Sequence, residues 1–298
     1  MKLTIVLCNY NTRDVLARAL ESLLATQGDL AGEVIVVDNA SRDGSAAMVR
    51  ERFPAVRVIE SGANRWFSGG NNLGLRAARG EYALILNPDT IIPPGALATL
   101  VAYLDEHPAV GAVTPRMTFA DGALQRTCSR FPGYGDALLS YTFLGVLFPR
   151  WRERRRRAMW YEGWERDSTR AIEVAPGSCL MARRAILARI GYFDERLRLF
   201  FTDDDLCRQI VGTGAAIHFV AEATIVHDEH ASLSQVPRLT QRVYWADLLT
   251  YTRKYHGRAA AWLLAALLIP TRAAMAARRG LYASRNNLDH AQLPTTDT

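Results

Sequence analysis

The sequence of 298 residues lacks the patterns that mark several large classes of protein. No run of about twenty apolar residues is present that could cross a bilayer. The first residues turn polar at Asn9, before the apolar core of a secretory signal would be long enough, so we expect no signal peptide. The four cysteines show no metal-ligand spacing and no disulfide framework, which favours a reducing compartment; they are Cys8, Cys128, Cys179 and Cys207.

Glycine-rich phosphate-binding loops are also missing. The first predicted loop contains Asn9-Tyr-Asn-Thr12, which is neither Gly-x-Gly-x-x-Gly nor Gly-x-x-x-x-Gly-Lys-Ser/Thr. This counts against a dinucleotide-binding Rossmann domain and against a P-loop. A nucleotide bound here would have to be held by side chains.

The composition is that of a globular protein with a basic surface. Apolar residues make up 49% of the chain and charged residues 22%, and the formal charge of +6 comes largely from arginine. The length allows one large α/β domain, or one domain with an appended segment. The positive charge favours anionic partners such as nucleotides or phospholipid. Nucleic-acid binding would rest on charge alone, and we do not expect it.

Apolar runs alternate with segments of helical periodicity in the first third of the chain. Residues 3–8, 34–37 and 83–86 are continuous apolar runs typical of buried strands, and apolar residues recur at helical spacing between 15 and 24. Strands that alternate with helices predict an α/β fold with a doubly wound, mostly parallel sheet.

Each of these strands ends in polar side chains. Asn9 and Asn11 follow the first strand, Asp38 the second and Asp89 the run at 83–86. Because parallel strands bring their carboxyl ends to one edge of the sheet, we expect a nucleotide site there. Asp38 can accept the ring N–H of uracil or thymine. Asp89 suits a divalent cation, although it could equally cap the next helix.

Four motifs in this order resemble the family 2 glycosyltransferases, which are inverting enzymes of the GT-A fold, and are most similar to their bacterial rhamnosyltransferase-like branch. The motifs are Asn9-Tyr-Asn11, Asp38-Asn-Ala-Ser41, Asn64 with the following Gly69-Gly-Asn-Asn-Leu-Gly74, and Asn87-Pro-Asp-Thr90. The resemblance implies that the donor is bound by Asn9, Asn11, Asp38, Ser41, Gly70, Asn71, Asn87 and Asp89. It also implies a divalent cation, Mg²⁺ or Mn²⁺, held by Asp89 and His227. Asn87 stands where many relatives have the first carboxylate of an Asp-x-Asp pair.

A second acidic motif lies in Phe200-Phe-Thr-Asp-Asp-Asp-Leu-Cys207. Three successive carboxylates cannot all ionise cheaply in one site of low dielectric, so at least one should have a raised pKa. The resemblance, through the family pattern Glu-Asp-x-Asp-Leu-Cys, implies that Asp203 is the catalytic base and that Asp205 orients the acceptor. Thr202 takes the place of the Glu, and it is also a plausible N-cap for a helix that begins here.

The pattern predicts three regions. Residues 1–235 would form the GT-A catalytic domain, with an acceptor-side insertion at about 128–170 whose arginines and aromatic residues suit a membrane surface, a lipid-linked acceptor or a solvated helix face. Residues 236–285 would form a helical extension. Its apolar segment 259–270 suits an interfacial helix, a dimer contact or a helix packed on the catalytic domain. A disordered tail is expected at 286–298.

The expected function is therefore transfer of a sugar, with L-rhamnose as the leading candidate by resemblance, from a dTDP- or UDP-sugar. The acceptor would be a hydroxyl of a glycan or of a polyprenyl-diphosphate-linked glycan, in cell-surface polysaccharide synthesis at the cytoplasmic face of the plasma membrane. Two alternatives remain. A sugar-phosphate nucleotidyltransferase should show a basic, glycine-rich loop after the first strand. A non-catalytic nucleotide-sugar-binding module is favoured by Thr202 in place of Glu.

Overall fold

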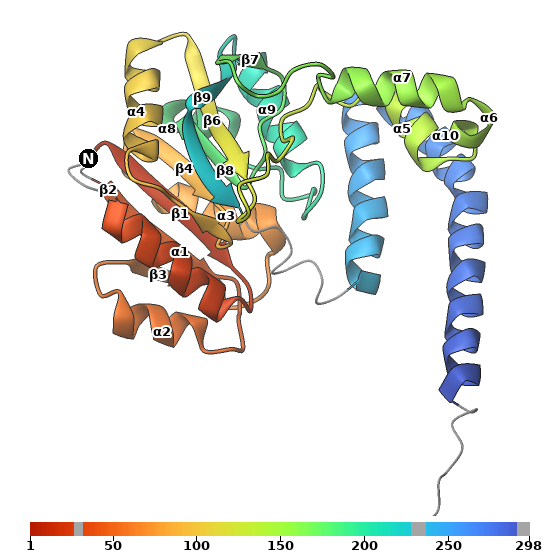
Figure 1. Cartoon of the computed structure of the whole chain (residues 1–298), viewed down its shortest axis with the longest axis horizontal. Helices are drawn as coiled ribbons and strands as arrows, with labels where there is room; N and C mark the ends of the chain where they lie inside the picture. The colour runs from red at the N-terminus through yellow and green to blue at the C-terminus, as the bar shows by residue number, and fades with distance from the viewer. Residues whose placement is uncertain (27–31, 228–236, 291–298) are drawn as a thin grey trace, which may run out of the picture. The chain divides into compact units, whose positions relative to one another are not determined.

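The computed structural model describes residues 1–26, 32–227 and 237–290 (Figure 1). The chain divides into two compact units. Unit 1 comprises Met1–Phe131 and Ala158–Tyr251, and unit 2 comprises Pro132–Arg157 and Thr252–Thr298. The domain limits that the sequence indicates, at about 128, 170 and 236, stay predictions.

The described strands of unit 1 form one mixed sheet in the order β3-β2-β1-β4-β8-β6-β9-β5, with β7 paired to β9. The strands are β1 (Leu3–Asn9), β2 (Gly32–Asp38), β3 (Arg57–Glu60), β4 (Tyr82–Leu86), β5 (Thr90–Ile91), β6 (Val110–Thr118), β7 (Arg170–Ile172), β8 (Cys179–Arg183) and β9 (Ala216–His227). Strands β1 to β4 are mutually parallel where they pair. The predicted α/β class and the parallel arrangement of the first strands are therefore confirmed.

Helices cover both faces of this sheet. They are α1 (Arg13–Thr26), α2 (Ser45–Arg52), α3 (Trp66–Ala77), α4 (Ala96–Glu106), α8 (Arg184–Ile190) and α9 (Thr202–Gly212). Because side chains alternate along a strand, those of β1 divide between two cores. Ile5 and Leu7 pack with residues of α1, α2 and α4, whereas Val6 packs with residues of α3, α8 and α9. The apolar run of β1 is continuous because both of its faces are buried.

The glycines of the Gly69–Gly74 motif allow α3 to pack closely on the sheet. A Cβ atom added at Gly70 would lie 2.3 Å from Cys8 Sγ, and one added at Gly74 would lie 2.4 Å from Val6 Cγ1. Neither distance is possible for real atoms, so any larger residue would push the helix off β1. These two glycines therefore have a packing role in the contact between α3 and β1.

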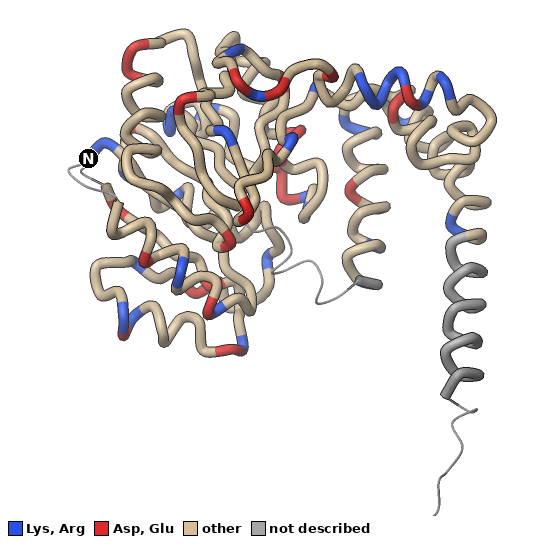
Figure 2. The backbone as a smooth tube through the Cα atoms, viewed as in Figure 1, with Lys and Arg blue, Asp and Glu red and all other residues tan. Residues whose placement is uncertain are grey.

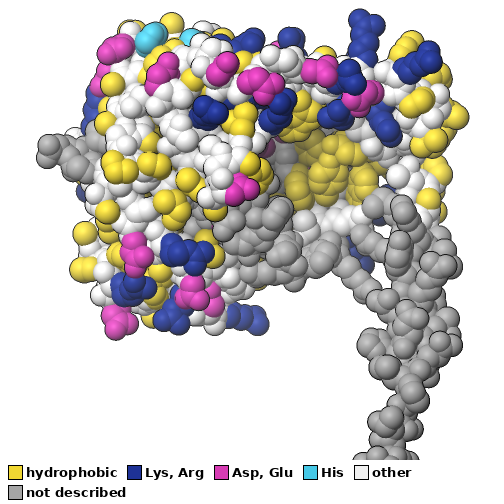
Figure 3. All heavy atoms as spheres, viewed as in Figure 1, with side chains coloured by type: hydrophobic (Ala, Val, Ile, Leu, Met, Phe, Trp, Pro, Cys, Tyr) yellow, Lys and Arg dark blue, Asp and Glu magenta, His cyan; other side chains and the backbone are white. Residues whose placement is uncertain are grey.

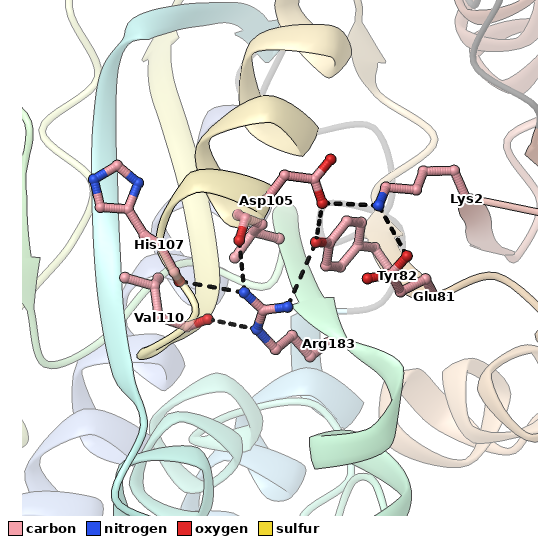
Figure 4. A network of polar contacts seen from close by, with 8 residues as sticks. Lys2, Glu81, Tyr82, Asp105, His107, Val110 and Arg183 are labelled. Carbon is pink, nitrogen blue, oxygen red and sulfur yellow. Dashed lines mark hydrogen bonds and ion pairs between the residues drawn. The ribbon is translucent and has the colours of Figure 1, made fainter.

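A polar network lies where β4 begins and its antiparallel neighbour β8 ends (Figure 4). Arg183 Nη2 donates to the carbonyl of Leu104 at 2.6 Å, and the hydroxyl of Tyr82 donates to Asp105. Hydrogen bonds from Lys2 and then Tyr82 lower the pKa of the Asp105 carboxyl. The network fixes the end of α4 to the sheet, away from the carboxyl ends of the parallel strands.

Unit 2 is helical. It contains α5 (Tyr134–Tyr141), α6 (Leu144–Leu147), most of α7 (Pro149–Met159) and the larger part of α10 (Pro237–His290). Gly257, with φ 87° and ψ 170°, divides α10 into two helical parts. The helix runs to His290, within the segment predicted as a tail, and residues 291–298 lie outside the described part. None of the described helices is both long and apolar enough to cross a membrane.

Candidate active site

A cavity of about 670 Å³ lies in unit 1, where β1 and β4 end. Its polar lining includes Asn87, Asp89, Asp203, Asp204 and His227. Aromatic side chains make up much of the remaining wall; they are Tyr10, Trp66, Phe67, Phe200, Phe201 and Tyr244. The cavity thus combines a few carboxylates with a largely apolar wall, which is typical of a small-molecule site.

Asp89 and His227 face each other because of the pairing of two strands. The antiparallel register of β5 and β9 places Thr90 opposite His227, so the residue before Thr90 lies beside the imidazole. Asp89 Oδ1 lies 3.3 Å from His227 Nε2, and both side chains are buried. Asp89 Oδ1 has no hydrogen-bond partner among the described residues.

Gln125 determines which nitrogen of His227 carries the proton. Its Nε2 donates to the backbone carbonyl of His227 at 2.5 Å, which turns its Oε1 toward His227 Nδ1 at 3.0 Å. Because Oε1 can only accept, Nδ1 donates to Gln125, and this bond directs Nε2 toward Asp89. The ring nitrogen Nε2 and the Asp89 carboxylate oxygen therefore face each other in a buried part of the cavity.

A divalent cation fits this pair as part of its ligand set. A carboxylate and a neutral imidazole are suitable ligands for Mn²⁺, and Mg²⁺ is commonly held by one or two carboxylates together with substrate phosphates. No group of three or more His, Cys, Asp or Glu that could hold a metal occurs within residues 1–26, 32–227 and 237–290. The remaining ligands would come from water and a bound substrate.

Asp203 lies on the first turn of α9, where its carboxylate is held by the backbone. Its Oδ2 accepts the N–H of Gly177 at 3.3 Å, and its Oδ1 accepts the N–H of Asp204 at 3.2 Å. Burial raises the pKa of the Asp203 carboxyl above its ordinary value. A raised pKa brings a carboxylate closer to the pH at which a general base works best.

Asp204 has a pKa that is raised further. Burial is the main cause, and the negative charge of Asp203 adds to it, so the pKa lies well above the ordinary 3.8. The prediction that at least one of the three carboxyls has a raised pKa is therefore met at Asp203 and Asp204. Asp205 is almost fully buried, and its Oδ2 accepts a hydrogen bond from Gln209 at 2.8 Å instead of lining the cavity.

The prediction that Thr202 caps α9 is wrong. The residue in the N-cap position is Phe201, which has a positive φ of 58° and makes no side-chain capping bond. Thr202 is the first residue of the helix. The three aspartates do occupy the first turn, where their negative charge is favourable for the helix dipole.

Several residues expected to bind the donor form a hydrogen-bonded cluster at the ends of β1 and β2. Ser41 Oγ accepts hydrogen bonds from Asn9 Nδ2 at 3.2 Å and from the Asn11 N–H at 3.0 Å, and the Ser41 N–H donates to Asp38 Oδ2 at 3.1 Å. None of these four residues is among those that line the cavity. Asp38 Oδ1 is buried and has no hydrogen-bond partner among the described residues.

Two more of the expected donor-binding residues lie on α3, outside the cavity lining. Gly70 packs on Cys8, and Asn71 Nδ2 donates to the carbonyl of Phe67 at 2.9 Å. Asn71 Oδ1 is buried and has no hydrogen-bond partner among the described residues, so donor binding by these two residues stays a prediction.

Asn87, by contrast, lines the cavity beside Asp89. Its N–H donates to the carbonyl of Ser178 at 2.9 Å, which ties the end of β4 to the segment before β8. The structure thus brings Asn87, Asp89, Asp203 and His227 together in one cavity.

Asn39 and Asn64 belong to the motifs of the family resemblance but were not among the expected site residues, and both lie in the wall of the cavity. Asn39 Nδ2 donates to Asn64 Oδ1 at 3.1 Å and to the carbonyl of Trp66 at 3.0 Å. Both asparagines and Trp66 line the cavity. In the sequence, the signal for these residues was their position: Asn39 directly follows β2, and Asn64 lies shortly before α3.

Asp247 was also missed, and nothing in its local sequence would have indicated it. It lies on α10 and is fully buried, and its Oδ2 accepts the N–H groups of residues 198, 199 and 200 at 3.1, 2.9 and 3.0 Å. The carbonyl of Arg198 in turn accepts the N–H groups of Phe67 and Ser68 at the start of α3. One carboxylate therefore holds the loop that leads into α9.

Comparison with known proteins identifies the family. Residues 4–191 match the family described as Glycosyl transferase family 2. The chain belongs to this family. As a family 2 glycosyltransferase it is 28% identical over 251 residues to the N-acetylglucosaminyl-diphospho-decaprenol L-rhamnosyltransferase of Mycobacterium tuberculosis, an alignment that covers 79% of this chain and 78% of that protein. It is 26% identical over 253 residues to the O-antigen biosynthesis protein RfbC of Myxococcus xanthus, which covers 84% of this chain and 19% of that protein.

Solved structures confirm the GT-A fold of this family 2 glycosyltransferase. GalNAc-T7 with UDP, GalNAc and Mn²⁺ aligns with a TM-score of 0.61 at 16% identity, over 85% of this chain and 48% of that chain. The mannosyltransferase PcManGT of Pyrobaculum calidifontis with GDP-Man and Mn²⁺ aligns with a TM-score of 0.54 at 22% identity, over 92% and 80% of the two chains. The predicted rhamnosyltransferase-like branch of the family is confirmed by the sequence relatives.

Proposed function

We propose that the protein transfers a sugar, with inversion, from a pyrimidine nucleoside diphosphate donor to a hydroxyl of a glycan acceptor. The observation that carries this proposal is that Asp203 lines the same cavity as the Asp89–His227 pair, where the parallel strands end. A base for the acceptor and a cation site for the departing diphosphate are the two groups that such a transfer needs.

The donor would bind at the ends of β1, β2 and β4. The buried Oδ1 of Asp38, which lacks a hydrogen-bond partner among the described residues, supports recognition of the ring N–H of uracil or thymine. Asp89 and His227 would hold Mg²⁺ or Mn²⁺ together with the diphosphate. The cation would supply charge stabilisation for the leaving group. Two of the structural relatives contain Mn²⁺, which supports the same assignment.

Asp203 would take the proton of the acceptor hydroxyl as that oxygen attacks the anomeric carbon from the face opposite the diphosphate. The hydrogen bonds from Gly177 and Asp204 hold its carboxylate in place, and its raised pKa makes it a better base. Attack from the opposite face inverts the configuration at the anomeric carbon.

L-Rhamnose is the leading candidate for the transferred sugar, and a polyprenyl-diphosphate-linked glycan for the acceptor. The support is the name of the mycobacterial relative, whose alignment covers 79% of this chain. Such an acceptor would place the reaction at the cytoplasmic face of a membrane, in the synthesis of a cell-surface polysaccharide.

The test is a panel of dTDP- and UDP-sugars offered to the full-length protein with a polyprenyl-diphosphate-linked N-acetylglucosamine and Mn²⁺. We expect transfer from one donor, with an inverted anomeric configuration in the product by NMR. Asp203→Asn should lower kcat by about 10²–10⁴-fold, because the base is lost while the shape is kept. The affinity of the Asp203→Asn variant for the nucleotide, measured by calorimetry, should equal that of the unmodified protein.

The matched control is Glu51→Gln, an equal change of charge at an exposed position of α2, which should retain full activity. Transfer that is unaffected by Asp203→Asn would contradict the assignment of the base. If the unmodified protein binds the nucleotide but neither transfers the sugar nor hydrolyses the donor, the protein is a non-catalytic binding module.

A further inference from the structure

Unit 2 carries an exposed apolar stripe along α10. Residues at helical spacing on one side of this helix are all apolar and all exposed; they are Ala259, Trp262, Leu263, Ala266, Ile269, Pro270 and Ala273. The side chain of Trp262 is 76% exposed. Leu264 and Leu268, on another side of the same helix, are buried. The helix therefore has one apolar side that is buried and one that the described residues leave uncovered.

A second group of exposed apolar side chains lies on α6 and α7. Val146 is 76% exposed, Leu147 62% and Trp151 67%, and Phe148 stacks on Trp151. Helix α7 has no buried residue. Hydrophobic and basic side chains gather together over these helices (Figure 3). Large apolar side chains gathered on a surface indicate a binding site, because single exposed ones are common but groups are not.

Positive charge is concentrated in the same unit. The sequence of unit 2 holds thirteen Arg and Lys against four Asp and Glu, a net charge of +9, so the rest of the chain carries −3 to give +6 overall. Six of these arginines lie on α7 (Figure 2). Arg150, Arg152 and Arg154 form no ion pair with a carboxylate among the described residues, whereas Arg155 pairs with Asp136.

We propose that unit 2 docks on the surface of an anionic lipid bilayer. The stripe on α10 and the apolar residues of α6 and α7 would enter the interface between head groups and acyl chains, where tryptophan is favoured, and the arginines would contact lipid phosphates. A second copy of the chain is a poorer occupant, because it would bring together two units that each carry a net charge of +9. All residues of the proposed docking surface belong to unit 2, so the proposal does not depend on the chemistry proposed for unit 1.

The test is flotation of the full-length protein with vesicles of phosphatidylcholine alone, or with phosphatidylglycerol added. We expect binding to the anionic vesicles that weakens with added salt. Changing Arg150, Arg152 and Arg154 together to Gln should weaken this binding on the order of 100-fold. Changing Trp262 and Ile269 to Ser should weaken binding to the anionic vesicles by about tenfold or more.

The matched control replaces Arg50, Arg52 and Arg57 of unit 1 by Gln, an equal loss of charge that should leave vesicle binding unchanged. Circular dichroism checks that each variant is folded. Wild-type protein that stays out of the anionic vesicle fraction would overturn the proposal, as would stripe and arginine variants that bind like wild type. A dimer that dissociates when Trp262 and Ile269 are changed, without vesicle binding, would assign the surface to a second copy. No sugar transfer is measured, so failure here leaves the proposed activity untouched.

Discussion

At the scale of single residues, Asp203 and Asp204 show how burial of a carboxyl works against stability at neutral pH. Both carboxylates line the cavity on the first turn of α9, and burial raises the pKa of each. The motif indicated the carboxylates and their raised pKa values. It did not indicate that Gly177, 26 residues away, donates to Asp203, because that contact depends on how the segment before β8 meets α9.

Asp204→Asn should stabilise the protein at neutral pH. Because the pKa of Asp204 is higher in the folded chain than its ordinary 3.8, ionisation lowers the free energy of unfolding as the pH rises from about that value through the raised pKa. Asn resembles the protonated form and avoids this loss. We expect the melting temperature of the variant to exceed that of wild type at pH 8, by about 2–4 °C for each kcal/mol gained.

The measurement is thermal unfolding of the metal-free protein between pH 4 and pH 8. The difference between variant and wild type should shrink as the pH falls toward 4. A difference in melting temperature that stays constant from pH 4 to pH 8 would show that the ionisation of Asp204 is not its cause.

At the scale of elements, the first part of α10 belongs to the same unit as the cavity and holds the loop before α9 in place. Asp247 binds three successive backbone N–H groups of the loop before α9, and two residues of that loop, Leu199 and Phe200, line the cavity. Strands β1, β2 and β4 were predictable from their apolar runs. The capping of α9 was predicted wrongly, because Phe201 adopts a left-handed backbone conformation that its residue type does not suggest.

Asp247→Ala should loosen this loop. Three N–H groups would lose a charged acceptor, with an expected cost of about 3 kcal/mol or more in the free energy of unfolding. Hydrogen exchange at the amides of residues 198–200 should become faster, while exchange in β1 changes only as far as global stability does. Asp247→Asn, which keeps one acceptor oxygen and the same shape, is the matched variant and should have a smaller effect. Unchanged protection of these three amides in Asp247→Ala would refute the role assigned to Asp247.

At the scale of the whole molecule, the structure contains two compact units that hydrophobic periodicity alone does not indicate. Unit 2 gathers two segments that are far apart in the sequence and carries a net charge of +9, whereas unit 1 carries −3. Periodicity cannot pair distant segments, because it reports only on neighbours along the chain. The division of α10 at Gly257 depends on a backbone conformation, φ 87° and ψ 170°, that is essentially restricted to glycine.

Gly257→Ala should therefore destabilise the protein by about 1–3 kcal/mol, through backbone strain and not through a clash, since no atom lies within 4 Å of the added Cβ. Thermal unfolding measures the effect. Gly212→Ala is the matched control, because that glycine also has free space around it but a helical backbone, and we expect no loss there. Equal melting temperatures for Gly257→Ala and wild type would contradict this prediction.

The sequence by itself determined the alternating strands and helices, the polar residues at the strand ends and the acidic motif of α9, because all of these depend on local patterns of apolar and polar residues. Only the tertiary structure decided which polar residues meet. Asn9 and Ser41 bond to each other, whereas Asp89 lies against His227 across the pairing of β5 with β9. That pairing joins segments far apart in the chain, and its register is set by the packing of the whole sheet.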